Sequence, residues 1–207
     1  MTSLIVRPYD RDHDLLDAVR ADGRPRARVE RPRETAVVLG RGSRPAVELR
    51  LAEIERDRVP VYRRPGGGCA VVLDPGNVVV AIAEPQAALP RPRELFSAFS
   101  ARLLRALARL GFADVRREDV SDLARGDRKV GGACLYAPRG AVLYTATLLV
   151  EPRVDLMERY LAHPPREPAW RRGRPHAGFV GRLADRSGSP STAELAVALE
   201  NALRREA

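Results

Sequence analysis

The most informative segment of this chain runs Arg63-Arg64-Pro65-Gly66-Gly67-Gly68 and continues directly into the apolar run 69–73. Glycine has no Cβ, so three consecutive glycines let backbone amides come close to an anion or a flat ligand. The two arginines bring positive charge to the same place. A strand follows the glycines and no Lys-Ser or Lys-Thr pair does, which excludes a Walker phosphate loop and a dinucleotide-binding fingerprint. The segment therefore predicts an anion-binding loop, with a tight sheet corner as the simpler alternative.

A second segment, Asp127-Arg128-Lys129-Val130-Gly131-Gly132, contains the only lysine among the 36 Lys and Arg residues. A compact ammonium can enter between a phosphate and a carboxylate oxygen, where a planar guanidinium does not fit. The neighbouring glycines again let the backbone approach a ligand. Lys129 is therefore our first candidate for a catalytic residue. The alternative is a surface lysine in a chain whose composition favours arginine.

The composition is that of one globular domain with a basic balance of charge. The chain has 207 residues, of which 44% are hydrophobic and 30% charged, and its formal net charge is +9. We expect a single domain over residues 1–207. The charge indicates an acidic partner. Arginines alternate with acids along most of the chain, and the denser clusters Arg24–Arg33 and Arg166–Arg174 lack stacked aromatics. An acidic protein is therefore a better candidate partner than nucleic acid.

The sequence also bears on location and on metal binding. No apolar run has the length of a membrane span and the N-terminus lacks the apolar core of a signal peptide, so we expect a cytoplasmic protein that does not bind a membrane. The two cysteines are Cys69 and Cys134, and the three histidines, His13, His163 and His176, are scattered. We therefore expect neither a disulfide framework nor a metal site built by the protein.

The hydrophobic pattern predicts an α+β fold, in which helices pack on antiparallel or mixed sheets. The clearest helix is Arg93–Leu110, whose apolar residues form one stripe. The last helix begins with a capping box of Ser191 and Glu194. Further helices are expected at Asp12–Ala21, Ala46–Arg58 and Val154–Ala162, and strands at Leu4–Val6, Thr35–Leu39, Val59–Tyr62, Cys69–Leu73, Asn77–Ala83, Arg128–Leu135 and Ala141–Val150.

Two connections carry signals of their own. Asp74-Pro75-Gly76 is a Pro-Gly turn between two expected strands, and it predicts a hairpin. Arg24–Arg33 is dominated by charges and is broken by two prolines, so it is predicted to be an exposed loop.

The order of these segments resembles the catalytic domain of lipoate-protein ligases, a family that also contains biotin ligases and octanoyl transferases. The resemblance extends from about Thr35 to Leu161. It rests on five segments that follow one another in the family's order, namely Val37–Arg41, Val59–Asn77, Ser121–Leu123, Gly126–Ala133 and Tyr144–Val150. The resemblance implies a biotin/lipoate ligase-like α+β domain, in which the glycine segment and the lysine segment close over an acyl-adenylate.

The resemblance further implies an enzyme that activates lipoate or octanoate with ATP and Mg²⁺ to an acyl-AMP. The acyl group then passes to a lysine of an acidic lipoyl carrier domain. By matched position, Lys129 would be catalytic and would stabilise charge on the carbonyl and phosphate oxygens. The residues matched to the acyl and nucleotide sites are Arg63, Arg64, Gly66, Gly67, Gly68, Asp74, Asn77, Asp122, Gly131, Gly132, Thr145 and Thr147.

Departures from the family pattern leave alternatives open. Leu73 and Thr145 stand where many ligases have histidine, and we expect no C-terminal accessory domain of the kind found in the common bacterial ligase. Either a separate subunit supplies that part, or this protein does not carry out adenylation by itself. An ATP-independent acyltransferase would carry the acyl group on a cysteine; Cys134 is the candidate because Lys129 would lower its pKa. A non-catalytic protein that binds a lipoylated domain is the third alternative.

Overall fold

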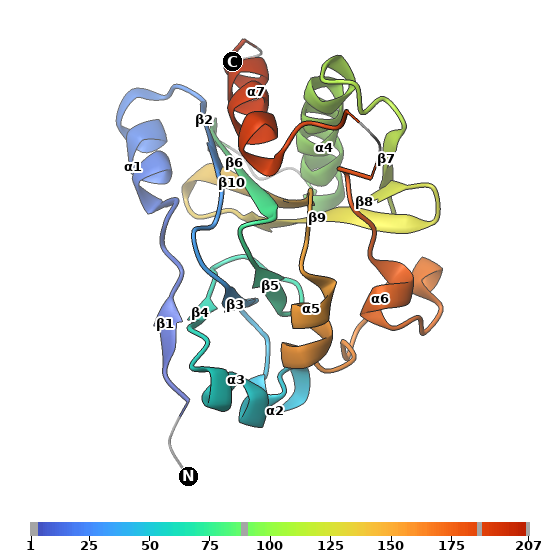
Figure 1. Cartoon of the computed structure of the whole chain (residues 1–207). Coiled ribbons are helices and arrows are strands. Elements are labelled where there is room, and N and C mark those ends of the chain that lie inside the picture. The colour runs from blue at the N-terminus through green and yellow to red at the C-terminus, as the bar shows by residue number, and fades with distance from the viewer. Residues whose placement is uncertain (1–3, 88–90, 186–187, 206–207) are drawn as a thin grey trace.

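The computed structural model describes residues 4–87, 91–185 and 188–205, which form two β-sheets with helices around them (Figure 1). The larger sheet is antiparallel throughout. Its strands, in spatial order, are β2 (Arg26–Glu30), β6 (Asn77–Gln86), β10 (Gly140–Leu149), β9 (Arg128–Tyr136), β8 (Asp122–Arg125) and β7 (Val115–Glu118). The smaller sheet is mixed, because β4 pairs in parallel with both of its neighbours whereas β3 and β5 pair antiparallel. Its order is β1 (Val6–Pro8), β4 (Val61–Arg63), β3 (Ala36–Leu39) and β5 (Val71–Leu73). The predicted α+β class is confirmed.

Helices cover both faces of the larger sheet. Successive side chains of β6 point to opposite faces, and both sets are apolar. Val80 and Ile82 of β6 belong to the main apolar core, which includes the buried stripes of two helices that lie side by side in Figure 1. Ala81 and Ala83 pack with Leu15 on the other face. The covering helices are α4 (Pro92–Arg109) and α7 (Thr192–Arg204) on the first face and α1 (His13–Asp22) on the second. The predicted capping box at the start of α7 is confirmed.

The smaller sheet packs against a second apolar cluster on the opposite side of the molecule from α4 and α7 (Figure 1). Val37 and Leu39 of β3 contribute to this cluster, together with Ile54 and Met157 from two short helices. The short helices of this half are α2 (Pro45–Glu48), α3 (Leu51–Asp57), α5 (Val154–Tyr160), the 3-10 turn η1 (Ala169–Arg171) and α6 (His176–Phe179). The molecule thus has two packed halves, and the strands of both halves meet between them.

The segment Arg24–Arg33 is not the exposed loop that its charges and prolines predicted. Residues Arg26–Glu30 form β2, an edge strand that pairs with β6. Acidic residues of α1 neutralise its arginines: Arg28 pairs with Asp14, and Arg26 with the last residue of the helix. Charged side chains are common on edge strands because they discourage pairing with another chain. Ion pairs between elements therefore let an arginine-rich segment form a strand here.

Two further predictions about local structure are wrong for a common reason. The turn at Asp74-Pro75-Gly76 does not close a hairpin: β5 pairs with β3 in the smaller sheet and β6 lies in the larger sheet, so the turn carries the chain between them. The segment Ala46–Arg58 is not one helix, because Leu49 leaves the helical conformation to bridge to Leu161. Both outcomes depend on pairing with distant parts of the chain, which a local pattern does not contain.

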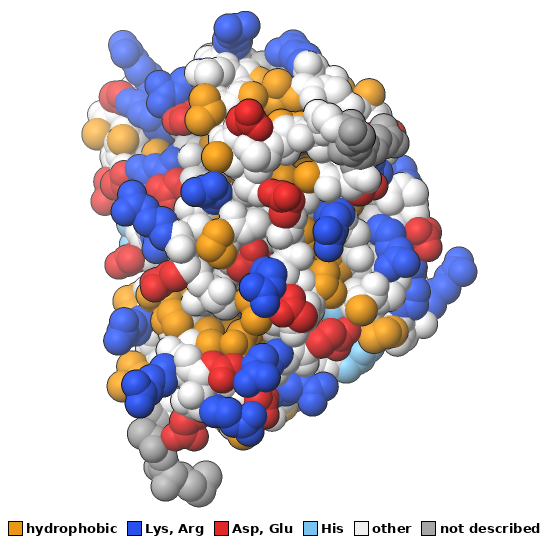
Figure 2. Space-filling view, viewed as in Figure 1, with side chains coloured by type: hydrophobic (Ala, Val, Ile, Leu, Met, Phe, Trp, Pro, Cys, Tyr) orange, Lys and Arg blue, Asp and Glu red, His pale blue; other side chains and the backbone are white. Residues whose placement is uncertain are grey.

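The surface carries charges of both signs. Basic and acidic side chains are interspersed over the face seen in Figure 2. Many of them form pairs, such as Arg153 with Asp155 and Arg159 with Asp57. Within residues 4–87, 91–185 and 188–205, no helix combines the length and the apolar character needed to cross a membrane.

Candidate active site

A cavity of about 460 Å³ lies where the strands of the two sheets meet. One part of its wall is apolar: Val38 and Val71 come from the smaller sheet, and Val79 and Leu149 from the larger one. The polar part of the wall includes Asp122, Lys129, Arg171 and His176. A cavity of this volume, largely apolar with a few convergent polar groups, has the form of a small-molecule site.

Lys129 lies on β9 and lines the cavity, where it forms an ion pair with Asp122 of β8. Its Nζ donates a 2.6 Å hydrogen bond to Asp122 Oδ1. The other carboxylate oxygen, Oδ2, accepts a 3.2 Å hydrogen bond from the indole Nε1 of Trp170. Asp122 is only 7% exposed, so its negative charge acts on Lys129 with little screening by water. The two hydrogen bonds therefore orient the only ammonium side chain of the protein along the cavity wall.

Two glycines of β9 make room for this arrangement. A Cβ on Gly132 would lie 3.1 Å from both Cε and Nζ of Lys129, so the absence of a side chain lets the lysine lie across the strand. A Cβ on Gly131 would lie 2.8 Å from the backbone oxygen of Thr147 in β10. Gly131 therefore allows close strand pairing, and Gly132 allows the position of the lysine. Both glycines line the cavity, as do Thr145 and Thr147.

Arg64 stabilises the glycine segment through hydrogen bonds to its backbone oxygens. Its Nε and Nη2 donate to Gly67 O at 3.1 and 2.7 Å, Nη2 also donates to Cys69 O at 2.8 Å, and Nη1 donates to Val38 O at 3.1 Å. Gly68 has a φ of +92°, a conformation that side chains of L residues rarely adopt. Gly68 and Arg64 line the cavity, whereas Gly66 and Gly67 do not. A Cβ on Gly66 would come within 2.7 Å of Cys134 Sγ, so this glycine serves packing.

Three other residues that the resemblance assigned to the site lie outside the cavity lining. Arg63 Nη1 donates to the backbone oxygens of Gly40 and Ser43, both at 2.9 Å, and so fixes the turn after β3. Asp74 and Asn77 are fully buried in the turn between the sheets. Asn77 Oδ1 accepts from the Asp74 amide at 2.9 Å, and Asp74 Oδ1 accepts from the Gly76 amide at 2.7 Å. The local contacts of these three residues stabilise backbone turns.

Both cysteines line the cavity. Burial raises the pKa of the Cys134 thiol, and the cation that partly opposes this effect is Arg64. The expectation that Lys129 lowers the pKa of Cys134 is therefore wrong, because proximity in sequence does not bring the ammonium to bear on the thiol. A buried thiol with a raised pKa, such as that of Cys134, is a poor nucleophile. Cys69 Sγ lies 3.5 Å from the backbone oxygen of Arg166.

Residues of the segment 163–181 line one side of the cavity, and the sequence did not indicate this. It is attached to the strand that carries the lysine: Gly181 N donates to Lys129 O at 2.8 Å, and Arg174 Nη1 donates to Asp127 O at 3.0 Å. Arg174 Nη2 also donates to Trp170 O at 3.1 Å. Within the cluster Arg166–Arg174, Arg174 thus ties the segment to Asp127, the residue that precedes β9.

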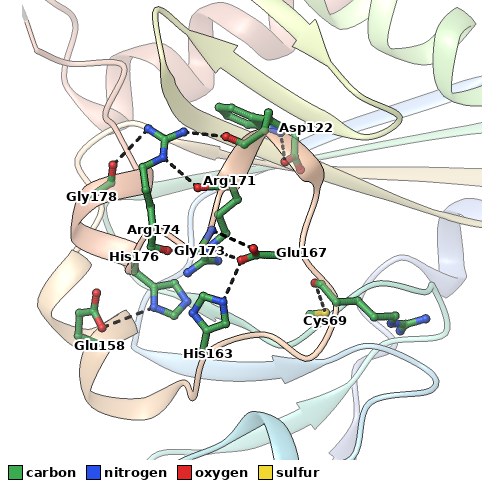
Figure 3. A network of polar contacts seen from close by, with 12 residues as sticks. Cys69, Asp122, Glu158, His163, Glu167, Arg171, Gly173, Arg174, His176 and Gly178 are labelled. Carbon is green, nitrogen blue, oxygen red and sulfur yellow. Dashed lines mark hydrogen bonds and ion pairs between the residues drawn. The ribbon is translucent and has the colours of Figure 1, made fainter.

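Two histidines of this segment lie close to carboxylates. His163 Nε2 lies 2.9 Å from Glu167 Oε2, and His176 Nδ1 lies 3.6 Å from Glu158 Oε2 (Figure 3). Glu167 Oε1 also accepts a 2.9 Å hydrogen bond from the Gly173 amide. Burial and the neighbouring Arg171 lower the pKa of His176, so its neutral form is favoured near pH 7.

Glu48 is a further buried residue of the cavity wall that sequence reasoning missed. Its Oε2 accepts from Ser43 Oγ at 2.9 Å and from the Ala70 amide at 2.7 Å. It therefore connects the turn after β3 to the segment that follows the glycines.

Within the part of the chain that the structure describes, no three His, Cys, Asp or Glu residues are grouped in a way that would bind a metal ion.

The chain belongs to the lipoyl protein ligase A/B catalytic domain family, whose model matches residues 8–203. Among curated proteins, it is 29% identical over 127 residues to the probable lipoate-protein ligase A of Mycoplasma pneumoniae, covering 60% of this chain and 36% of that protein. It is 30% identical over 129 residues to the lipoate-protein ligase A of Psychrobacter cryohalolentis, covering 62% and 36%. The matches span little more than a third of the length of these relatives.

Solved structures share the fold. A bi-partite lipoate protein ligase from Thermoplasma acidophilum, studied with its E2 lipoyl domain, matches with a TM-score of 0.75 and 22% identity, over 98% of this chain and 79% of that one. A lipoate-protein ligase A bound with ATP matches with a TM-score of 0.76 and 22% identity, over 94% and 77%. The T. acidophilum protein Ta0514 with bound lipoic acid gives a TM-score of 0.74 and 22% identity, over 94% and 76%. These similarities support the fold predicted from the resemblance.

Proposed function

We propose that this chain is the catalytic unit of a lipoate-protein ligase, which activates lipoate with ATP and transfers the lipoyl group to a lysine of a lipoyl carrier domain. The observation that carries the proposal is Lys129. It is the only lysine in the chain, it lines a largely apolar cavity of about 460 Å³, and its charge is oriented by Asp122. A short apolar acid needs such a cavity for its chain and a cation for its reacting end. The family supports the same assignment.

In the first step, a carboxylate oxygen of lipoate attacks the α-phosphorus of ATP. The new bond joins oxygen to phosphorus, and the bond to the leaving pyrophosphate breaks. The Lys129 ammonium stabilises negative charge on the phosphate and carbonyl oxygens as it develops. In the cavity, Lys129 exchanges its contact with Asp122 for contacts with these oxygens. Asp122 keeps its hydrogen bond from Trp170 Nε1 during this exchange.

In the second step, the amine of a carrier lysine attacks the carbonyl carbon of lipoyl-AMP. The bond from carbon to the phosphate oxygen breaks, AMP leaves, and the amine loses a proton as the amide forms. Lys129 again stabilises charge on the carbonyl oxygen. Arg64 acts indirectly, because its guanidinium is engaged by the carbonyls of Val38, Gly67 and Cys69. It fixes the shape of the glycine segment, and the backbone at Gly68 forms part of the cavity wall.

ATP in such a reaction is accompanied by Mg²⁺, which neutralises phosphate charge. Mg²⁺ at nucleotide sites is bound by one or two carboxylates together with phosphate oxygens and water. Two buried carboxylates line the cavity, and Glu48 is engaged by Ser43 and the Ala70 amide, so Asp122 is the one that would hold the ion. The net charge of +9 supports an acidic carrier domain as partner, although charges of both signs are spread over the face in Figure 2.

An ATP-independent acyltransferase that uses Cys134 is the second candidate, and the raised pKa of that thiol disfavours it. Incubation with lipoate or octanoate, ATP, Mg²⁺ and a lipoyl domain separates the two candidates, with intact mass and pyrophosphate release as readouts. We expect a lipoylated carrier and release of pyrophosphate. Transfer from an acyl carrier without ATP, through an acyl adduct on the protein, would support the acyltransferase. No mass change under any condition would favour a protein that only binds lipoylated domains.

A further inference from the structure

Arg171 lines the cavity and is only 5% exposed. Within the described residues, its Nη2 is one of three buried side-chain polar atoms without a hydrogen-bond partner; the others are Asn77 Nδ2 and Arg102 Nε. A buried polar atom that stays unpaired costs free energy, and most such atoms in folded proteins find a partner. Arg171 is the only one of these three residues that lines the cavity.

The rest of the Arg171 side chain is well fixed. Its Nε donates to Arg174 O at 2.8 Å and lies 3.5 Å from Glu167 Oε2. Its guanidinium carbon lies 5.1 Å from the centre of the Phe179 ring. These contacts engage the Nε edge and one face of the guanidinium, and they leave Nη2 without a partner. A guanidinium presents two parallel N–H groups to an oxyanion, a geometry that suits phosphate.

Arg171 also has a fixed relation to the proposed catalytic lysine. The preceding residue, Trp170, donates to Asp122, which binds Lys129 through its other oxygen. The segment continues to Gly181, whose amide donates to the backbone oxygen of Lys129. The cavity wall therefore holds Lys129 from β9 and Arg171 from the segment 163–181. It also includes Arg64, whose guanidinium is engaged by backbone carbonyls, and the exposed Arg166. Burial lowers the pKa of Arg171, which indicates a charge that the protein alone compensates incompletely.

We propose that Arg171 binds the pyrophosphate portion of a nucleoside triphosphate in this cavity, while Lys129 serves the α-phosphate and the acyl group. This inference rests on the proposed function and assigns it a phosphate subsite. A chain of phosphoanhydrides needs more than one cation along its length, and Arg171 is a buried arginine of the cavity wall with an unused donor. Its N–H groups would gain the partner that Nη2 lacks.

Direct binding tests the subsite without any turnover. Trp170 is the only tryptophan of the chain and the neighbour of Arg171, so its fluorescence reports on the site. Inorganic pyrophosphate, AMP and lipoate are titrated separately into the wild-type protein, into Arg171→Gln and Arg171→Lys, and into Arg172→Gln, with calorimetry as a second readout. Arg172 is exposed on the same segment and its substitution removes the same charge, so it is the matched control.

We expect pyrophosphate affinity to fall by about 10-fold or more in Arg171→Gln, because a hydrogen bond to a charged group is lost. The pyrophosphate affinity of Arg171→Lys should fall by less, and that of Arg172→Gln should equal the wild-type value. Affinities for AMP and lipoate should be unchanged in all variants. Equal pyrophosphate affinity in the wild type and both Arg171 variants would overturn the proposal, as would a wild-type protein that binds no pyrophosphate in the millimolar range.

If Arg171→Gln does not fold, Arg171→Lys still tests the proposal. This variant keeps the positive charge but lacks the two parallel N–H donors of the guanidinium, so its pyrophosphate affinity should still be lower than that of the wild type. A wild-type protein that binds pyrophosphate through Arg171 but never lipoylates a carrier would contradict the proposed function and leave the phosphate subsite standing. Normal lipoylation, together with a pyrophosphate affinity that does not depend on Arg171, would support the proposed function and contradict the phosphate subsite.

Discussion

Gly132 illustrates how a residue without a side chain affects the site. A Cβ at this position would lie 3.1 Å from Cε and Nζ of Lys129, and the far end of a lysine can move away by a few tenths of an ångström. We therefore expect Gly132→Ala to fold normally and to reduce kcat/KM for lipoylation by about 10-fold, the effect of displacing a catalytic group slightly. Gly67→Ala is the control, because a Cβ there meets nothing within 4 Å. Equal loss in both variants would contradict this role of Gly132.

Cys134 allows a sharp test at the same scale. Its thiol has a pKa raised by burial, and adenylation needs no thiolate. Replacing Cys134 and Cys69 together by serine should leave lipoylation within about threefold of the wild type, because the change in volume is small. Intact mass of the wild-type protein under turnover should show no thioester. An acyl adduct on Cys134, or loss of activity in the serine variant while the fold is retained, would move the protein to the acyltransferase class.

At the scale of elements, the sequence predicted those whose burial follows a regular period. The helix α4 presents Leu95, Phe99, Leu103 and Leu107 to the core at helical spacing, and this stripe alone is enough to predict it. The strand β2 was missed because its charges are neutralised by acids of α1, which packs against it, and this pairing is not part of the residue pattern of β2 itself. The turn at residues 74–77 was misassigned because its two strands belong to different sheets.

The N-terminus of α1 carries a titratable group whose effect on stability can be measured. Burial, together with Glu30 and Asp14, raises the pKa of Asp12 from 3.8 to about 6, against the opposing charges of Arg28 and Arg11. A carboxyl whose pKa is higher in the folded state binds more protons there between pH 4 and 6, so its contribution to the free energy of unfolding falls as pH rises through this window.

We therefore expect Asp12→Asn to be more stable than the wild type at pH 7 by about 1–3 kcal/mol, since each pKa unit corresponds to about 1.4 kcal/mol. The advantage should shrink as pH falls from 6 to 4. Urea denaturation of both proteins across this range measures the difference, with the exposed Asp10→Asn as control. A difference that does not change with pH would contradict a raised pKa for Asp12.

At the scale of the whole molecule, the sequence located the lysine and glycine segments of the site but not the wall that faces them. Lys129, Gly131, Gly132 and Thr147 do come together at one cavity. Three residues that the resemblance assigned to the ligand site instead hydrogen-bond to backbone groups of turns, namely Arg63, Asp74 and Asn77. The segment 163–181 could not be assigned to the cavity because its hydrogen bonds to β9 join residues about 50 positions apart in the chain. Side-chain type predicts chemistry, whereas tertiary pairing decides which groups meet.

The net charge of +9 leads to a prediction about docking of the carrier. If an acidic lipoyl domain is attracted by arginines on the enzyme, transfer from preformed lipoyl-AMP should slow as salt rises, because the Debye length falls from about 10 Å at 0.1 M to about 3 Å at 1 M. Hydrolysis of lipoyl-AMP in the absence of carrier serves as the control and should change little. Transfer that is insensitive to salt would reject electrostatic docking.

The central claim is that the ammonium of Lys129 stabilises the acyl-adenylate reaction, and lipoate-dependent exchange of labelled pyrophosphate into ATP measures that step without a carrier. The wild-type protein should catalyse this exchange. Lys129→Arg keeps the positive charge but replaces a compact ammonium by a planar guanidinium, and we expect at least a 100-fold loss of exchange, the size found when a group that stabilises developing charge is removed. Circular dichroism should show an unchanged fold. Exchange by Lys129→Arg at close to the wild-type rate would contradict the account.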